Sequence, residues 1–200
     1  LVKNKTPKYG NDDDYADDIM VSVFNEYKRL YYRQTDHQRR CISIVDMLPT
    51  TCHVYFGDVM IATPNGRLAH NPLSEGISPE KGADINGPTA VVKILLQDEH
   101  CETGGTLLNQ KFTPAAIAGE KGIDNLAALI RSYFAMNGHH MQFNVIDRQT
   151  LIEAQKNPEE YKELIVRVAG YSDYFRNLDK PLQNEIIERT EQSFGGCGCC

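Results

Sequence analysis

The chain has no tryptophan, and no apolar run approaches the roughly 18 residues that a membrane-spanning helix needs. It has no segment rich in lysine and arginine, and its formal net charge of −6 argues against a nucleic-acid partner. Residues 1–18 are polar and become acidic, so they do not resemble a signal peptide. We therefore predict neither a membrane nor a nucleic-acid partner. Because the first residue is Leu1 rather than methionine, we expect a fragment, or a chain whose remainder lies elsewhere.

The six cysteines do not form a disulfide pattern. Three of them are far apart in the sequence and three crowd the last four positions: Cys41, Cys52, Cys101, Cys197, Cys199 and Cys200. This usage favours a reducing, cytoplasmic setting, with Cys52 and Cys101 as structural thiols. Zinc needs about four ligands, and the terminal cysteines offer three. We expect residues 195–200 to be a flexible tail, and metal binding or lipid attachment remain the alternatives.

Other chemically suggestive residues have simpler interpretations. His139 and His140 lie between a predicted helix and a predicted strand, with no partner at metal-ligand spacing, so a surface turn is favoured over a metal site. Asp12, Asp13 and Asp14 are typical of a helix N-terminus, although three acids could also bind a cation. The glycines lack the lysine and hydroxyl of a phosphate-binding loop, and no hydrolytic triad is recognisable. No metal site is predicted.

Apolar spacing predicts an α/β fold. The expected strands are residues 41–45, 106–112, 141–146 and 164–168. The expected helices cover residues 14–33 and 179–193, a segment opened by Gly87-Pro88, one running from Asp124 to Gly138, one capped by Asp147, and one opened by Pro158. Strands and helices alternate over residues 105–194, which is typical of helices packed outside strands. Residues 57–90 read as a long irregular connection, and residues 57–82 as the one plausible internal boundary.

One short segment carries the functional signal. The apolar strand Leu164–Val168 continues directly into Ala169, Gly170, Tyr171 and Ser172. A glycine after a strand is ordinarily a turn that needs positive φ. However, the string Arg167-Val168-Ala169-Gly170-Tyr171-Ser172 resembles the signature of the glycyl radical enzymes, the pyruvate formate-lyase-like superfamily. Further stretches resemble the same family in the same order: residues 7–15, 62–67, 72–79, 86–91, 105–112 and 142–145.

The resemblance implies that Gly170 stores the radical. An unpaired electron on Cα is stabilised when its orbital lies parallel to both flanking amides, which needs a planar Cα that only glycine permits freely. Such a radical survives where oxygen and solvent are excluded, so we expect Gly170 to be buried inside a barrel. The implied fold is the C-terminal part of a ten-stranded β/α barrel of the glycyl radical enzyme type, with the glycine loop inserted into it. The implied division is residues 1–70 as the end of the barrel domain, 71–194 as the glycine radical domain and 195–200 as a tail.

The resemblance also implies partners. The chain itself is expected to bind no cofactor, since the radical is installed by an activating enzyme that uses an iron–sulfur cluster and S-adenosylmethionine. In this family the radical passes to a cysteine on a second loop, and that loop belongs to an N-terminal portion that this chain lacks. Cys52 lies in residues 50–57, which correspond to another part of the family. We therefore expect no turnover by this chain alone, a small organic substrate, a homodimer when complete, and an anaerobic bacterial source.

Two features favour a lyase or dehydratase. Ala169 at its position in the motif and the stretch Asn109-Gln110-Lys111 look closer to glycerol/diol dehydratase and choline lyase relatives than to pyruvate formate-lyase. The expected reaction is hydrogen abstraction from the substrate, followed by cleavage of a C–O, C–N or C–C bond. The alternatives are formate acetyltransferase-type acyl transfer, a small stand-alone subunit that replaces a damaged radical domain, and an inactive remnant. Residues 94–104 and the cysteine-rich tail depart from the family pattern.

Overall fold

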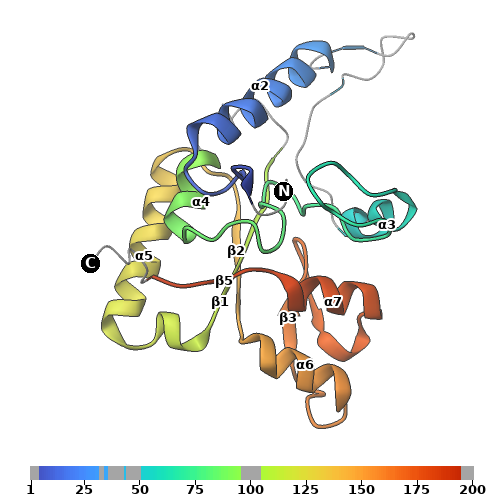
Figure 1. The fold of residues 1–200 in the computed structure, drawn as a ribbon. Coiled ribbons are helices and arrows are strands. Elements are labelled where there is room, and N and C mark those ends of the chain that lie inside the picture. The colour runs from blue at the N-terminus through green and yellow to red at the C-terminus, as the bar shows by residue number, and fades with distance from the viewer. Residues whose placement is uncertain (1–4, 32–33, 36–42, 44–50, 96–104, 195–200) are drawn as a thin grey trace.

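The structure, a computed structural model, describes residues 5–31, 34–35, 43, 51–95 and 105–194. The strand expected at residues 41–45 lies almost wholly outside this part of the chain, as do Cys101 and the tail 195–200. Within it, helices lie on both sides of a small parallel sheet (Figure 1). The α/β prediction is therefore confirmed.

The central sheet has the strand order β2-β1-β5, with both pairings parallel. Its strands are β1 (Leu108–Phe112), β2 (Met141–Val145) and the short β5 (Glu191–Gln192). Helix α5 (Gly119–Ala135), preceded by the 3-10 helix η2 (Pro114–Ile117), connects β1 to β2. Such a crossover is the usual way to join neighbouring parallel strands.

One face of the sheet is apolar. Leu108 and Phe112 of β1 are fully buried, and they pack with Met141 and Phe143 of β2 against α5 and helix α4 (Pro88–Leu95). Since side chains alternate between the two faces of a strand, Asn109 and Lys111 of β1 and Gln142 and Asn144 of β2 point to the opposite face. That opposite face carries the polar side chains described below.

A second apolar cluster lies beyond the sheet. It joins helix α3 (Cys52–Val59), helix α6 (Arg148–Lys156), helix α7 (Lys180–Glu188), the 3-10 helix η3 (Phe175–Asn177) and the hairpin of β3 (Ile165–Arg167) with β4 (Ser172–Tyr174). The strands of the hairpin are antiparallel, and Val166 and Val168 point into this cluster. Asp147 and Asp179 accept backbone hydrogen bonds at the starts of α6 and α7, as predicted.

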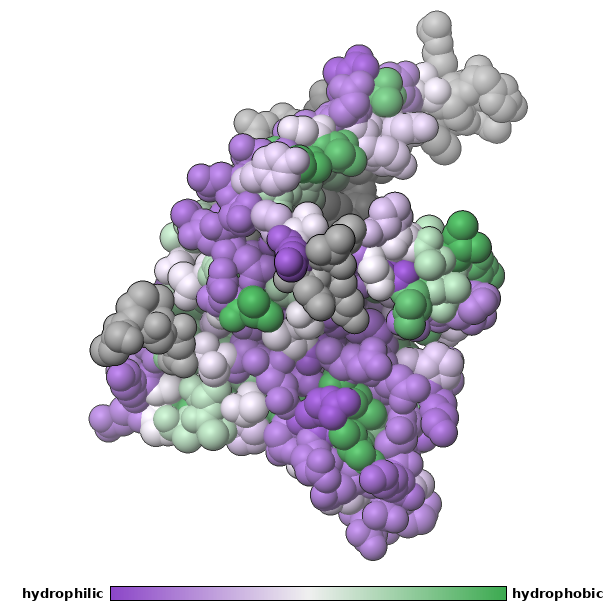
Figure 2. All heavy atoms as spheres, viewed as in Figure 1, coloured by the Kyte–Doolittle hydropathy of each residue, from purple (hydrophilic) through white to green (hydrophobic). Residues whose placement is uncertain are grey.

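Helix α2 (Asp14–Tyr31) extends away from the sheet (Figure 1). Asp13 accepts a hydrogen bond from the backbone of Ala16, which supports the prediction of an acidic helix start. Apolar side chains along α2 are exposed, and green spheres mark them in Figure 2. Among the described residues no helix is long and apolar enough to cross a membrane.

Several predicted element boundaries were wrong. Helix α5 begins at Gly119 rather than Asp124, with Ala118 as its N-cap residue. Residues 158–163 form turns rather than a helix. Helix α7 ends at Glu188 rather than at residue 193 because Glu191 and Gln192 pair with β1. Helix α3 was not predicted.

Candidate functional site

Gly170 lies at the tip of the β3–β4 hairpin. The N–H of Val168 donates to the carbonyl of Tyr171 at 2.8 Å, which leaves Ala169 and Gly170 as the two tip residues. Gly170 has a φ of +78°, which residues with a side chain rarely adopt. Val168 and Ala169 are fully buried, whereas Gly170 is exposed. Gly170 is therefore not buried in this chain by itself, and its burial inside a barrel stays a prediction for the complete protein.

The sheet face beneath the hairpin is polar. It consists of Asn109 and Lys111 of β1 and Gln142 and Asn144 of β2, which we call the polar sheet face. The parallel register places Asn109 beside Gln142 and Lys111 beside Asn144. Lys111, Gln142 and Asn144 are buried at 1%, 5% and 6% exposure, so each of these polar groups needs a hydrogen-bond partner.

Gln142 and Asn144 find those partners in the hairpin backbone. The Asn144 amide donates to the carbonyl of Arg167 at 2.7 Å and accepts from its N–H at 2.8 Å, as a neighbouring strand would. Gln142 Oε1 accepts from the N–H of Gly170 at 3.1 Å and from Arg167 Nε at 2.9 Å. The glycine at the tip is therefore attached to β2 through one side-chain oxygen.

The remaining polar motif residues form a pair across the hairpin. Arg167 and Ser172 are opposite each other in the antiparallel register, and Arg167 Nη1 donates to Ser172 Oγ at 3.2 Å. Tyr171 is 41% exposed beside the glycine, and burial raises the pKa of its phenol. All six predicted motif residues therefore lie in this one hairpin.

A buried ion pair supports the hairpin from α7. Arg189 Nη2 donates to the carbonyl of Val168 at 2.9 Å and to Glu185 Oε2 at 2.8 Å. Burial opposes ionisation of Glu185, yet the charge and hydrogen bonds of Arg189, together with the nearby His53, hold its pKa at about 2. His53 of α3 lies 3.6 Å from the same carboxylate. Sequence reasoning missed these residues.

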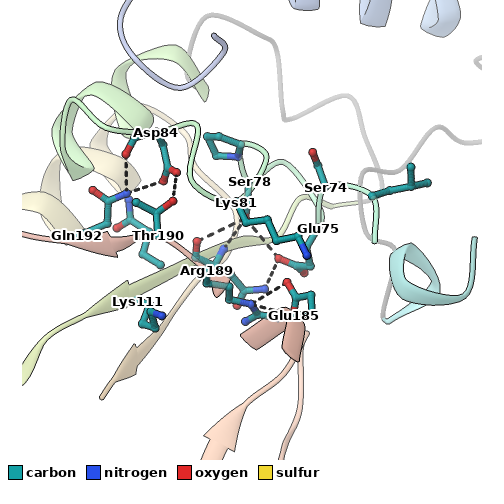
Figure 3. A pocket seen from close by; sticks show the side chains of 14 residues that line it. Ser74, Glu75, Ser78, Lys81, Asp84, Lys111, Glu185, Arg189, Thr190 and Gln192 are labelled. Atoms are coloured by element: carbon teal, nitrogen blue, oxygen red, sulfur yellow. Dashed lines mark hydrogen bonds and ion pairs between the residues drawn. The ribbon is translucent and has the colours of Figure 1, made fainter. Parts of the chain in front are cut away.

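Glu75 reaches the polar sheet face from the connection between α3 and α4. Its Oε2 accepts from the side-chain amide of Asn109 and, at 3.4 Å, from the hydroxyl of Ser78. Burial raises the pKa of Glu75, while the charge of Arg189 and the bond from Asn109 oppose that rise. Glu75, Arg189 and Glu185 line a small cavity of about 30 Å³ (Figure 3).

Gly76 sets the position of Glu75. Its φ is +57°, and a Cβ at this position would lie 2.3 Å from the carbonyl oxygen of Leu107. We expect Gly76→Ala to destabilise the protein by about 2–4 kcal/mol, because it adds backbone strain and a steric collision. Gly82→Ala is the matched control, since Gly82 has a φ of +76° and open space around it. Chemical denaturation of both variants checks this, and equal losses would contradict it.

Asp84 connects the irregular segment to β5. It accepts hydrogen bonds from the Thr190 hydroxyl and, at 2.5 Å, from Gln192 Nε2 (Figure 3). Burial raises the pKa of Asp84 to about 6, and the bonds from Thr190 and Gln192 oppose the rise. This contact holds Thr190 two residues beyond the end of α7.

The raised pKa of Asp84 predicts a pH dependence of stability. Between about pH 4 and pH 6 the folded state holds a proton that the unfolded state has lost, so the unfolding free energy falls as the pH rises through this window. Asp84→Asn should remove this decline and stabilise the protein by roughly 2 kcal/mol at pH 7. Denaturation at several pH values tests it, with exposed Asp124→Asn as the control. A decline that persists in Asp84→Asn would refute the assignment.

The other candidate residues have structural roles. His139 is exposed and His140 is half-buried in the turn before β2, as predicted. Asp12 forms an ion pair with Lys93 at 2.6 Å, and Cys52 is half-buried at the start of α3. Among the described residues, no group of three or more His, Cys, Asp or Glu could hold a metal ion.

Taken together, these features define an α/β domain that presents a glycine backbone at a hairpin tip. A family model described as "Glycine radical" matches residues 73–176, and one described as "Pyruvate formate lyase-like" matches residues 1–57. The chain therefore belongs to the glycyl radical enzyme family, which confirms the resemblance seen in the sequence.

Two curated relatives illustrate the range of the family. The chain is 63% identical over 196 residues to trans-4-hydroxy-L-proline dehydratase of Clostridioides difficile, covering 97% of this chain and 24% of that protein. It is 45% identical to isethionate sulfite-lyase of Oleidesulfovibrio alaskensis, covering 92% of this chain and 23% of the relative. The chain thus spans about a quarter of the length of these relatives, which are dehydratases and lyases.

Solved structures agree with the sequence relatives. The crystal structure of hydroxyproline dehydratase from Clostridioides difficile with trans-4-hydroxy-L-proline bound superposes with a TM-score of 0.91 at 62% identity, covering 97% of this chain and 24% of that one. The glycerol-bound, B12-independent glycerol dehydratase from Clostridium butyricum gives 0.90 at 46% identity, covering 96% and 24%. The fold is that of the matching portion of these barrel enzymes, so the predicted fold class is confirmed.

Proposed function

We propose that Gly170 is the residue that carries the radical of this protein. The observation that supports it most is the position of Gly170 at φ +78° on the hairpin tip, within the segment that the glycine radical model matches. Arg167, Val168, Ala169, Tyr171 and Ser172 form the hairpin that holds it. The N–H of Gly170 is hydrogen-bonded to Gln142 of the sheet, while the residue remains exposed to solvent. A partner protein can therefore reach the Cα hydrogen.

Radical transfer then needs a partner for the exposed tip. We propose that a radical S-adenosylmethionine activating enzyme removes one Cα hydrogen from Gly170. The glycine radical next takes the hydrogen of a cysteine thiol carried by the portion of the protein outside this chain, which leaves a thiyl radical. That portion would also cover the tip and exclude oxygen. Because Gly170 is exposed here, nothing within the described residues blocks either encounter.

The proposed reaction is a radical dehydration. The thiyl radical abstracts a hydrogen from the carbon next to the one bearing the hydroxyl group. The hydroxyl leaves as water with a proton that comes from the N–H or O–H group on the radical carbon, and the thiol returns its hydrogen to the product radical. The identity of 63% to a trans-4-hydroxy-L-proline dehydratase supports trans-4-hydroxy-L-proline as the substrate. The 46% identity to a glycerol dehydratase and to a 1,2-propanediol-dehydrating enzyme supports a small polyol as the second candidate.

We further propose that the chain divides as its sequence indicates. Residues 1–70 would belong to the barrel domain and residues 71–194 to the glycine radical domain. The family matches that end at residue 57 and begin at residue 73 support a boundary in this interval. A homodimer and a cytoplasmic, anaerobic setting complete the proposal.

The substrate assignment is tested by anaerobic turnover. The intact protein, activated by its activating enzyme, is incubated separately with trans-4-hydroxy-L-proline, glycerol and 1,2-propanediol, and the dehydrated products are measured by mass spectrometry. We expect product from hydroxyproline alone. Product from glycerol or 1,2-propanediol alone would replace the substrate assignment. The absence of turnover of all three by radical-bearing protein would reject dehydration of these substrates.

A further inference from the structure

Three side-chain groups form a continuous chain of hydrogen bonds that ends at the Gly170 amide. The Glu75 carboxylate accepts from the Asn109 amide nitrogen, and the Asn109 oxygen accepts from Gln142 Nε2. Gln142 Oε1 in turn accepts from the N–H of Gly170 at 3.1 Å. We call Glu75, Asn109 and Gln142 the amide relay.

The direction of the relay is fixed by its two ends. Gln142 Oε1 faces the N–H of Gly170 and the Nε–H of Arg167, and both of these groups can only donate. Gln142 must therefore present its oxygen to the hairpin and its nitrogen to Asn109. Asn109 must then present its own oxygen to Gln142 and its nitrogen to Glu75. A carboxylate at the far end accepts that last hydrogen.

A directed chain of this kind is polarised along its length. A negative carboxylate that accepts from one amide makes the oxygen of that amide a stronger acceptor for the next. The relay is mostly buried, with Glu75 at 4% and Gln142 at 5% exposure, so water screens this effect little. Electron density is therefore pushed toward the nitrogen of Gly170.

That nitrogen is one of the two groups that stabilise a glycine radical. The amide nitrogen donates electron density to the half-filled Cα orbital, and the carbonyl on the other side withdraws it. A strong acceptor on the N–H increases the donation and also fixes the plane of the amide. The relay thus acts on the radical from the sheet side and leaves the opposite side of Cα open.

We propose that Glu75, Asn109 and Gln142 are positioning residues that orient the Gly170 amide and tune the stability of its radical. The inference rests on the proposed function of Gly170. It assigns a role to the buried carboxylate of Glu75, which accepts hydrogen bonds from Asn109 and Ser78, and to the polar sheet face.

The test compares variants of the intact, anaerobically activated protein. Each protein is labelled with nitrogen-15 glycine, and electron–nuclear double resonance measures the hyperfine coupling between the radical and the Gly170 nitrogen. Gln142→Met removes the acceptor, while Glu75→Gln keeps the shape and removes the charge. Asn144→Leu is the matched control, since it removes two hairpin bonds to Arg167 and leaves the relay intact.

We expect the nitrogen coupling to change in Gln142→Met, to change less but in the same direction in Glu75→Gln, and to stay unchanged in Asn144→Leu. The radical yield of Gln142→Met should fall about fivefold, as expected for the loss of one hydrogen bond. Couplings and yields that stay at the wild-type values in both relay variants would overturn the inference. So would an identical change in Asn144→Leu, because it would show a structural effect alone.

A second measurement separates this inference from the proposed function. In the protein before activation, hydrogen exchange at the Gly170 amide should be slow, and it should become several-fold faster in Gln142→Met. Glu75→Gln should leave the total stability of the protein unchanged. If the Gly170 amide exchanges equally fast in the wild-type protein and in Gln142→Met, the relay is overturned even if a radical forms. A wild-type protein with a slow amide but no radical after activation overturns the proposed function, and with it the tuning role.

Discussion

Gly170→Ala is expected to abolish the organic radical and all turnover while the protein still folds. A methyl group on this Cα crowds the flanking carbonyl and prevents the planar radical. The cost to the fold is small: the nearest atom to the added Cβ is Leu107 Cδ1 at 3.6 Å, so only the positive φ of +78° adds strain, about 1–2 kcal/mol. Electron paramagnetic resonance and an anaerobic activity assay measure the first effect, and circular dichroism with denaturation measures the second.

Exposure to air gives an independent readout of the same variant. Oxygen attacks a glycine radical and cleaves the backbone, so the activated wild-type protein should break at Gly170 and Gly170→Ala should remain whole. Gly82→Ala is the matched control because its φ of +76° imposes a similar strain far from the hairpin. It should keep the radical and the cleavage. A Gly170→Ala protein that still breaks at this residue would place the radical elsewhere.

The second large effect is expected from Arg189→Met. This change leaves the Glu185 carboxylate buried without its arginine partner. It also removes the shortest hydrogen bond to the carbonyl of Val168, which keeps the longer bonds from Asn109 and Gln142 at 3.4 and 3.5 Å. Breaking a buried ion pair from one side costs about 3–5 kcal/mol, so the unfolding free energy should fall by that amount. The hairpin loses its support from α7, and the radical yield should fall with it.

Two variants make the Arg189 result specific. Arg176→Met breaks an exposed ion pair with Glu159, at 3.8 Å, and should cost less than about 1 kcal/mol. Adding Glu185→Leu to Arg189→Met should recover part of the stability, since the unpaired charge is then gone. A loss below 1 kcal/mol in Arg189→Met would contradict the assigned role of the pair, and so would the absence of any recovery in the double variant.

Apolar periodicity predicted the parts of the fold in which it persists through whole elements. Strands β1 and β2, helices α2 and α6 and the strand before Gly170 all follow the expected spacing. It was less accurate where a tertiary contact sets an element boundary. Thr190 has helical spacing from Ile186, yet its bond to Asp84 and the pairing of β5 with β1 end the helix earlier.

The hairpin could be predicted and its support could not. The motif around Gly170 is contiguous in sequence, so the sequence alone is enough to identify it. Glu75, Asn109, Gln142 and Arg189 come from four separate segments and act through contacts that depend on the register of β1 with β2. One signal was available: Gln142 and Asn144 alternate with the apolar residues Met141, Phe143 and Val145, which indicates a strand with one polar face. Only the covering hairpin and α7 show that this face is buried.

The most direct test of the account is electron paramagnetic resonance of the intact protein, activated without oxygen. The account predicts a doublet, split by the one hydrogen that remains on Cα of Gly170, which collapses to a single line when the protein is made with α-deuterated glycine. An activated protein without an organic radical would contradict it, and so would a doublet whose splitting is unchanged by deuteration of glycine.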